Sequence, residues 1–193
     1  MPGPGATPTD VLVIGGGPAG STVAALLARK GWQVTLLEKA RHPRFHIGES
    51  LMPMNLPILE RLGVLEQVRA IGVLKLGADF PAGDGEHNTF SFNRALGTGH
   101  DYAFHVRREE FDQLLFEHAR NQGVDARDEV RVERVDFAAE GGIAVHARTA
   151  ADVDACFRLR ALRTAPTAAR AWLRRRRASA GGFVCDTLQQ ALR

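Results

Sequence analysis

Two short apolar runs lie near the start of the chain, separated by glycines and a stretch of small and apolar residues. Residues 10–15 and 33–38 are rich in β-branched and aliphatic side chains, and apolar runs of this length predict buried parallel strands. Residues 19–30 suit a helix, which Gly31 ends at its C′ position. A strand, a glycine turn, a helix and a second strand in this order predict a βαβ unit.

The pattern changes beyond residue 40. Apolar residues at helical spacing predict a helix over 56–68, with Pro57 in its first turn. Residues 72–106 carry short alternating stretches broken by glycine and asparagine, which predict antiparallel strands and the start of a second domain. Another helix is predicted over 109–121, and a hairpin of two strands over 130–145.

Charge is distributed unevenly along the chain. Residues 1–157 hold 16 lysines and arginines against 21 acidic residues, whereas residues 158–193 hold nine arginines and one acidic residue. The net charge of +3 therefore comes from the tail. The mildly acidic body gives no case for nucleic-acid binding.

Composition also bears on compartment and on metals. No run approaches about 18 apolar residues, so neither a membrane span nor a membrane partner is expected. The N-terminus lacks the basic and apolar regions of a signal peptide, which favours a cytoplasmic protein. Cys156 and Cys185 are far apart, and the seven histidines show no paired ligand spacing, so no metal site is expected.

The glycine-rich turn has the G-x-G-x-x-G spacing of a dinucleotide site, with glycines at 15, 17 and 20. It follows a predicted strand, opens a predicted helix, and is matched by Glu38 at the end of the second strand. Gly15 permits the tight turn, Gly17 lets the backbone approach a pyrophosphate, and Gly20 lets the helix pack closely. The N-terminus of the helix favours the binding of phosphates. Glu38 can accept a hydrogen bond from a ribose hydroxyl, and its negative charge would repel a 2′-phosphate. This pattern predicts a binding site for the ADP portion of a dinucleotide. The alternative is a glycine-rich turn without a ligand. The pattern alone does not separate FAD from NAD.

Two segments resemble a known group of flavoproteins. Residues 10–39, with the step Pro18-Ala19-Gly20-Ser21, resemble the N-terminus of FAD-dependent monooxygenases, halogenases and geranylgeranyl reductases. Residues 43–53 (PRFHIGESLMP) resemble the G-E-S loop of flavin-dependent halogenases, which in that family lies along the flavin. The resemblance implies FAD as the cofactor, although Ser50 could instead cap the helix that follows. The implied cofactor contacts are Gly15, Gly17, Pro18, Ala19, Gly20, Ser21, Glu38, Lys39, Arg44, Gly48, Glu49, Ser50, Arg108 and Val132.

Lys75 lies in a stretch, residues 72–80 (GVLKLGADF), that is similar to the K-x-G-A-x-F segment of halogenases acting on phenolic or pyrrolic substrates. In that family the lysine holds and orients hypohalous acid, so the resemblance implies Lys75 as the catalytic residue. Lysine suits this task because it presents one nitrogen with movable donors and can lose a proton in apolar surroundings. The alternative is an ordinary solvated lysine, or one retained in a relative that does not halogenate.

Residues 105–112 (HVRREEFD) resemble the V-x-R-x-x-F-D helix start of the same family. By that match Arg108 lies near the flavin or its phosphates, whereas Arg107 faces solvent; the alternative for Arg108 is a plain helix-flanking arginine. Val132 aligns with the position whose backbone meets adenine in relatives, and a core valine is an equal alternative.

The resemblance, over about residues 10–157, implies an α/β fold with a Rossmann-like FAD-binding βαβ unit and a partial antiparallel β second domain. A disordered lead is expected over 1–9 and the first part of the FAD-binding domain over 10–71. The start of the substrate domain is expected over 72–106, the continued FAD-binding domain over 107–157, and an aberrant basic tail over 158–193.

The implied function is that of a halogenase-like FAD-dependent oxidoreductase. Such an enzyme uses dioxygen, halide and a small aromatic substrate, and takes reduced FAD from a separate flavin reductase. The first alternative is an FAD-dependent monooxygenase or reductase on the same scaffold, in which Lys75 has no special role. The second is an inactive truncated FAD-binding fragment.

The arginine-rich tail motivates the fragment alternative. The family pattern stops abruptly, acidic residues are absent between Asp154 and Asp186, and alanine and arginine are enriched. We therefore hypothesise that residues from about 161 onward are translated out of frame, which sequencing of the coding DNA would test. The alternative is a genuine basic, disordered tail that binds acidic partners.

Overall fold

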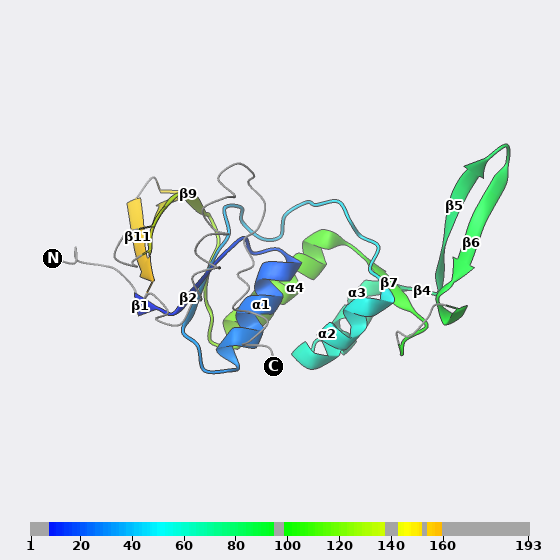
Figure 1. Ribbon diagram of the computed structural model, residues 1–193, viewed down its shortest axis with the longest axis horizontal. Helices are drawn as coiled ribbons and strands as arrows, with labels where there is room; N and C mark the ends of the chain where they lie inside the picture. The colour runs from blue at the N-terminus through cyan, green and yellow to red at the C-terminus, as the bar shows by residue number, and fades with distance from the viewer. Residues whose placement is uncertain (1–7, 95–98, 138–142, 152–153, 160–193) are drawn as a thin grey trace. The chain divides into compact units, whose positions relative to one another are not determined.

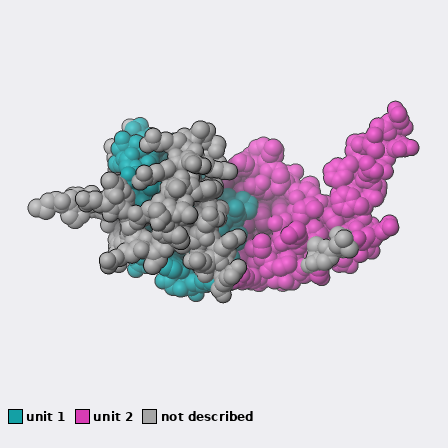
Figure 2. Space-filling view, in the orientation of Figure 1, with its two compact units in different colours: residues 1–41, 116–193 teal, residues 42–115 magenta. Residues whose placement is uncertain are grey.

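The structure is a computed structural model that describes residues 8–94, 99–137, 143–151 and 154–159. Residues 1–7 of the expected lead and residues 160–193 of the expected basic tail lie outside the described ranges. The chain divides into two compact units, one formed by residues 1–41 and 116–193 and the other by residues 42–115 (Figure 2).

A parallel sheet with one crossover helix forms the first part of the first unit (Figure 1). Its strands, in the order β2-β3-β8, are β2 (Val11–Ile14), β3 (Val34–Leu37) and β8 (Asp125–Arg127). Helix α1 (Pro18–Ala28) connects β2 to β3, and both strand pairs are parallel. The predicted βαβ unit is confirmed, and all four residues of β3 are buried, as its unbroken apolar run predicts.

A second sheet in the same unit has the order β1-β11-β10-β9. Its strands are β1 (Pro8–Thr9), β9 (Val130–Phe137), β10 (Ile143–Thr149) and β11 (Asp154–Leu159). The antiparallel pairing of β9 with β10 confirms the predicted hairpin. β11 adds to β10 antiparallel and to β1 parallel, and neither of these two strands follows from the sequence pattern.

Thr9 explains why the second sheet begins inside the expected lead. Its side chain is buried, and its Oγ1 lies 3.0 Å from the carbonyl oxygens of both Val11 and Gln33. Pro8 and Thr9 pair with Arg158 and Leu159. The strands therefore include two pairs of residues that the sequence did not place in strands. Pro8–Thr9 was assigned to the lead, and Arg158–Leu159 to the tail.

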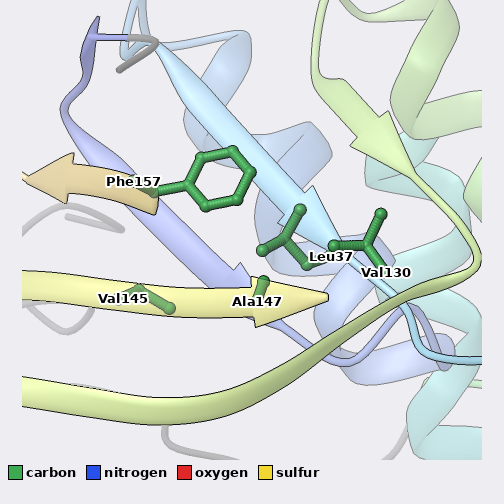
Figure 3. Close-up of a cluster of buried hydrophobic side chains, with 5 residues drawn as sticks. All are labelled: Leu37, Val130, Val145, Ala147 and Phe157. Atoms are coloured by element: carbon green, nitrogen blue, oxygen red, sulfur yellow. The ribbon is translucent and has the colours of Figure 1, made fainter. Parts of the chain in front are cut away.

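The core of the first unit lies where the two sheets meet. Leu37 from β3 packs with Val130, Val145, Ala147 and Phe157 from the antiparallel sheet, and their side chains point into one shared space (Figure 3). Leu37 is the last residue of β3, and Glu38 follows it directly. The packing of Leu37 therefore fixes the position of Glu38.

The second unit contains short helices and two strand pairs. Its elements are the 3-10 helices η1 (Pro53–Asn55) and η2 (Phe92–Arg94), helices α2 (Leu56–Leu62) and α3 (Leu65–Ile71), and strands β4 (Gly72–Lys75), β5 (Gly77–Gly83), β6 (Glu86–Ser91) and β7 (Ala103–Val106). β4 pairs antiparallel with β7, and β5 pairs antiparallel with β6. Antiparallel strands over 72–106 agree with the expectation.

The single helix expected over 56–68 is two helices. Gly63 ends α2 with φ +73°, a left-handed conformation that glycine adopts without steric cost, and its N–H donates to the Glu60 carbonyl. The apolar spacing survives the break, because Leu56, Leu62, Val64 and Val68 are all buried.

Helix α4 (Arg108–Asn121) starts within residues 42–115 and ends within residues 116–193. Gly123, with φ +88°, follows it as expected. None of the helices in the described ranges combines the length and the apolar character that a membrane crossing requires.

Candidate functional site

The glycine turn joins β2 to α1 in the first unit. Gly15 has φ +105°, which favours glycine, and its N–H donates to the Leu37 carbonyl at 2.8 Å. Gly17 is the N-cap of α1, and Pro18 occupies the first helical position, where its missing N–H costs nothing. The next N–H groups, of Ala19 and Gly20, have no partner inside the helix because they belong to its first turn. The turn thus presents donors and the positive end of a helix dipole, which suits an anion.

The turn is packed so closely that side chains are excluded at two positions. A Cβ on Gly20 would lie 1.9 Å from the Gly15 carbonyl oxygen. A Cβ on Gly16 would lie 2.7 Å from the Phe116 ring and 2.8 Å from the Glu38 Cβ. Sequence reasoning gave Gly20 this role and missed Gly16, which stands at a variable position of the motif; its only signal is the unbroken run of three glycines.

Glu38 and Ser21 hold the turn from either side. Glu38 is 4% exposed; its Oε2 accepts the Gly16 N–H at 2.8 Å, and its Oε1 accepts the Ala40 N–H at 2.9 Å. Ser21 is fully buried, and its hydroxyl donates to the Gly16 carbonyl at 3.2 Å. The Ser21 side chain therefore supports the turn, and the Glu38 carboxylate, a group with about four acceptor sites, lies beside it.

Lys39 and Val132 complete the expected contacts of the first unit. Lys39 follows Glu38 and is exposed. Val132 pairs with Ala147, and its side chain packs against the core cluster of Figure 3. Its side chain is thus that of a core valine.

The first unit supplies the chemistry that the ADP portion of FAD requires. The turn offers backbone N–H donors at a helix N-terminus for a pyrophosphate, and Glu38 offers a carboxylate for a ribose. Gly17, the N-cap of α1, has no Cβ beside these donors. The residues present therefore fit the cofactor.

In the second unit the G-E-S loop is bound to β7 by its backbone. The Val106 N–H donates to the Glu49 carbonyl, and the Leu51 N–H donates to the Phe104 carbonyl, both at 2.9 Å. Ser50 does not cap a helix, since Met52 is the N-cap of η1 and Asn55 that of α2.

Arg44, Arg108 and Asp112 form a buried charge cluster behind this loop. The fully buried Asp112 accepts from Arg108 at 2.7 and 3.1 Å and from Arg44 at 3.1 Å. Arg108 Nη1 also donates to the Ile47 carbonyl at 2.6 Å. Gly48, with φ +96°, passes so near that a Cβ there would lie 3.0 Å from Arg108 Nη1.

This cluster forms the protein surroundings of Arg108, which the resemblance places near the flavin or its phosphates. Its guanidinium is engaged with Asp112 and with the loop backbone. Asp112, which sequence reasoning left without a role, could have been suggested by its spacing of four from Arg108 in a helix. Arg107 is exposed and pairs with Glu109 and Glu110, in agreement with its expected solvent position.

Lys75 ends β4, opposite Ala103 of β7. Its Nζ lies 2.5 Å from Ser50 Oγ and 3.4 Å from the Leu51 carbonyl, and 5.0 Å from the centre of the Phe92 ring. The structure thus brings Lys75 to the G-E-S loop within one unit. Large apolar side chains are exposed on either side of Lys75, at Val73, Leu74 and Leu76.

The expected site residues fall into two groups by unit. The first unit holds Gly15, Gly17, Pro18, Ala19, Gly20, Ser21, Glu38, Lys39 and Val132, and the second holds Arg44, Gly48, Glu49, Ser50, Lys75 and Arg108.

Comparison with known proteins shows the family and the fold. Residues 8–160 match a family model described as FAD binding domain. A tryptophan 2-halogenase from Chondromyces crocatus is 44% identical over 136 residues, which cover 70% of this chain and 26% of that protein.

Two solved structures have the same fold over 79% of this chain. The myxobacterial chondrochloren halogenase CndH has a TM-score of 0.72 at 35% identity, with 36% of its chain covered. A flavoprotein/dehydrogenase from Cytophaga hutchinsonii has a TM-score of 0.73 at 34% identity, with 38% covered. The chain spans about a quarter of the curated relative and somewhat more than a third of these two solved chains.

Proposed function

Because the chain belongs to the FAD binding domain family, we propose that it holds the ADP portion of FAD in its glycine turn and that the protein is a flavin-dependent halogenase. The proposal that the protein is a halogenase rests on the position of Lys75. Its nitrogen ends 2.5 Å from Ser50 of the G-E-S loop, so the proposed catalytic group and a loop proposed to border the flavin meet in one unit.

The first unit binds the nucleotide by groups already in place. The N–H groups that open α1 donate to the pyrophosphate, and Gly17 lets the phosphates approach the backbone. Glu38 accepts a hydrogen bond from a ribose hydroxyl. Its buried negative charge disfavours a nucleotide with a 2′-phosphate.

When bound and reduced, FAD would supply two electrons to dioxygen, and the halide ion would supply two more as it is oxidised to hypohalous acid, with water as the other product. Lys75 holds that acid through its nitrogen and directs the halogen to an electron-rich ring carbon, which gives up a proton in exchange. Val73 lies two residues before Lys75 on β4, hence on the same face of the strand, and its exposed apolar side chain is suited to contact an aromatic ring. The proposed partners are therefore a small aromatic substrate, halide, dioxygen and a separate flavin reductase.

A second candidate is an FAD-dependent monooxygenase or reductase. It is favoured by the likeness to the flavoprotein/dehydrogenase from Cytophaga hutchinsonii, which has a TM-score as high as that of the halogenase. In that case Lys75 is an ordinary lysine, and products form without halide.

The test compares wild-type protein with Lys75→Ala and with Lys30→Ala, which removes another of the three lysines. Each protein is supplied with FAD, a flavin reductase, chloride or bromide, and a panel of phenols, pyrroles and indoles. The product masses are measured by mass spectrometry. Halogenated products from wild type and Lys30→Ala but not from Lys75→Ala support the halogenase. Oxygenated or reduced products that are insensitive to halide and to Lys75→Ala support the second candidate. FAD binding with no product from any substrate supports an inactive fragment.

A further inference from the structure

The Lys75 nitrogen is held on three sides by groups of its own unit. Ser50 Oγ lies 2.5 Å away, the Leu51 carbonyl oxygen 3.4 Å, and the face of the Phe92 ring 5.0 Å from its centre. An ammonium group has three N–H donors. The hydroxyl, the carbonyl and the ring face provide one acceptor for each of them.

These three groups are fixed by the backbone. The Leu51 N–H donates to the Phe104 carbonyl of β7 at 2.9 Å, and β7 pairs with β4, which carries Lys75. Phe92 is buried, and its N–H donates to the Leu76 carbonyl at 2.9 Å. The nitrogen is therefore aimed by a rigid frame, and removal of one acceptor changes its surroundings without loosening the strands.

We propose that Ser50 is a positioning residue for Lys75, a role that rests on the proposed function of that lysine. Of the three groups around the nitrogen, only the hydroxyl can both accept and donate a hydrogen bond. The carbonyl and the ring hold Lys75 only while it donates. Ser50 Oγ is also nearer to the nitrogen than the Leu51 carbonyl oxygen is, so it sets the direction of the amine when another N–H turns to a ligand.

The sequence suggested Ser50 as a cofactor contact or as a helix cap. The structure excludes the helix cap, because Met52 and Asn55 are the N-caps, and it places the Ser50 hydroxyl beside Lys75 Nζ. A threonine at this position would keep that hydroxyl. Ser50 is exposed and forms a bridge with His105 of β7, a position where a β-branched side chain is tolerated. Ser50→Thr is therefore the conservative variant, and Ser50→Ala removes only the hydroxyl.

The experiment measures the acylation rate of each lysine with acetic anhydride on the full 193-residue chain, followed by peptide mass spectrometry. Lys30 and Lys39 are both exposed and serve as internal references. Ser50→Ala should raise the rate at Lys75 relative to these two by about fivefold, the factor for one hydrogen bond of about 1 kcal/mol. Ser50→Thr should restore the wild-type ratio.

Two results would overturn the proposal. One is that the acylation rate of Lys75 relative to Lys30 and Lys39 is the same in Ser50→Ala as in the wild type. The other is that this relative rate is as high in Ser50→Thr as in Ser50→Ala. Unchanged rates at Lys30 and Lys39, together with an unchanged far-ultraviolet circular dichroism spectrum, exclude unfolding as the cause of an increase. The measurement needs neither flavin nor turnover. Failure of the halogenase proposal, seen as halogenation insensitive to Lys75→Ala, is therefore distinguishable from failure of the Ser50 role.

Discussion

Arg108 and Asp112 form a two-point ion pair one turn apart on α4, with Arg108 Nε 2.7 Å from Asp112 Oδ1 and Nη2 3.1 Å from Oδ2. The remaining nitrogen of the guanidinium donates to the Ile47 carbonyl. The pair therefore ties the start of α4 to the G-E-S loop. A carboxylate that is fully buried between two arginines is costly to remove, because it would leave their charges without compensation.

Asp112→Ala should lower the free energy of unfolding by about 3 kcal/mol, measured by urea denaturation followed by circular dichroism. The matched control is Glu110→Ala on the same helix, which breaks the exposed pair with Arg107 and should cost less than about 0.5 kcal/mol. Equal losses in the two variants would show that the buried cluster does not stabilise the loop.

Gly20→Ala tests the packing of the glycine turn. The added Cβ would meet the Gly15 carbonyl oxygen at 1.9 Å, and this backbone atom cannot move away as a side chain could. We expect a loss of stability of about 3 kcal/mol, at the upper end of overpacking changes, and a loss of nucleotide binding. Thr22→Ala on the same helix is the control and should bind nucleotide like the wild type.

Glu38→Gln should weaken FAD binding about tenfold, the effect of losing one charge-assisted hydrogen bond. The amide has one acceptor oxygen, so it cannot accept both the Gly16 and the Ala40 N–H groups. The variant should also discriminate less against ADP that carries a 2′-phosphate, as measured by competition with FAD. If the variant discriminates against the 2′-phosphate as strongly as the wild type, the Glu38 carboxylate does not exclude that phosphate.

The stability of the first unit should depend on the protonation of His118. Burial, and then the nearby charge of Arg29, lower the pKa of His118 below its ordinary value of 6.5. The folded state therefore binds a proton at this site less readily than the unfolded state, so the contribution is complete above about pH 6.5 and is lost as the pH falls through the lowered value. Wild type should lose more stability than His118→Gln between about pH 7.5 and 5; parallel unfolding curves would contradict this.

The local parts of the fold were predictable from the sequence. The βαβ unit, the hairpin over 130–145 and the end of α4 before Gly123 each depend on spacing within a short segment, and all are observed. The break at Gly63 was missed because the apolar period continues through it. Pairing of β1 with β11 was missed because it joins residues about 150 positions apart, which no local pattern encodes.

The candidate site shows the same division. Gly15, Gly20 and Glu38 act within or next to one turn, so their spacing was enough to identify them. The contacts of Arg108 with the Ile47 carbonyl and of Lys75 with the Ser50 hydroxyl join residues that are 61 and 25 positions apart in the chain. Neither of these two contacts could be read from spacing, whereas the pairing of Asp112 with Arg108 has a signal in their spacing of four, and its contact with Arg44 has none.

The most direct test of the account is calorimetric titration of the purified chain with FAD, followed by displacement with ADP. We predict saturable binding at one site, competition by ADP because the glycine turn and Glu38 recognise that half of the cofactor, and no binding by folded Gly20→Ala. No binding of FAD by folded wild-type chain, or equal binding by Gly20→Ala, would contradict the claim that this turn is the cofactor cradle.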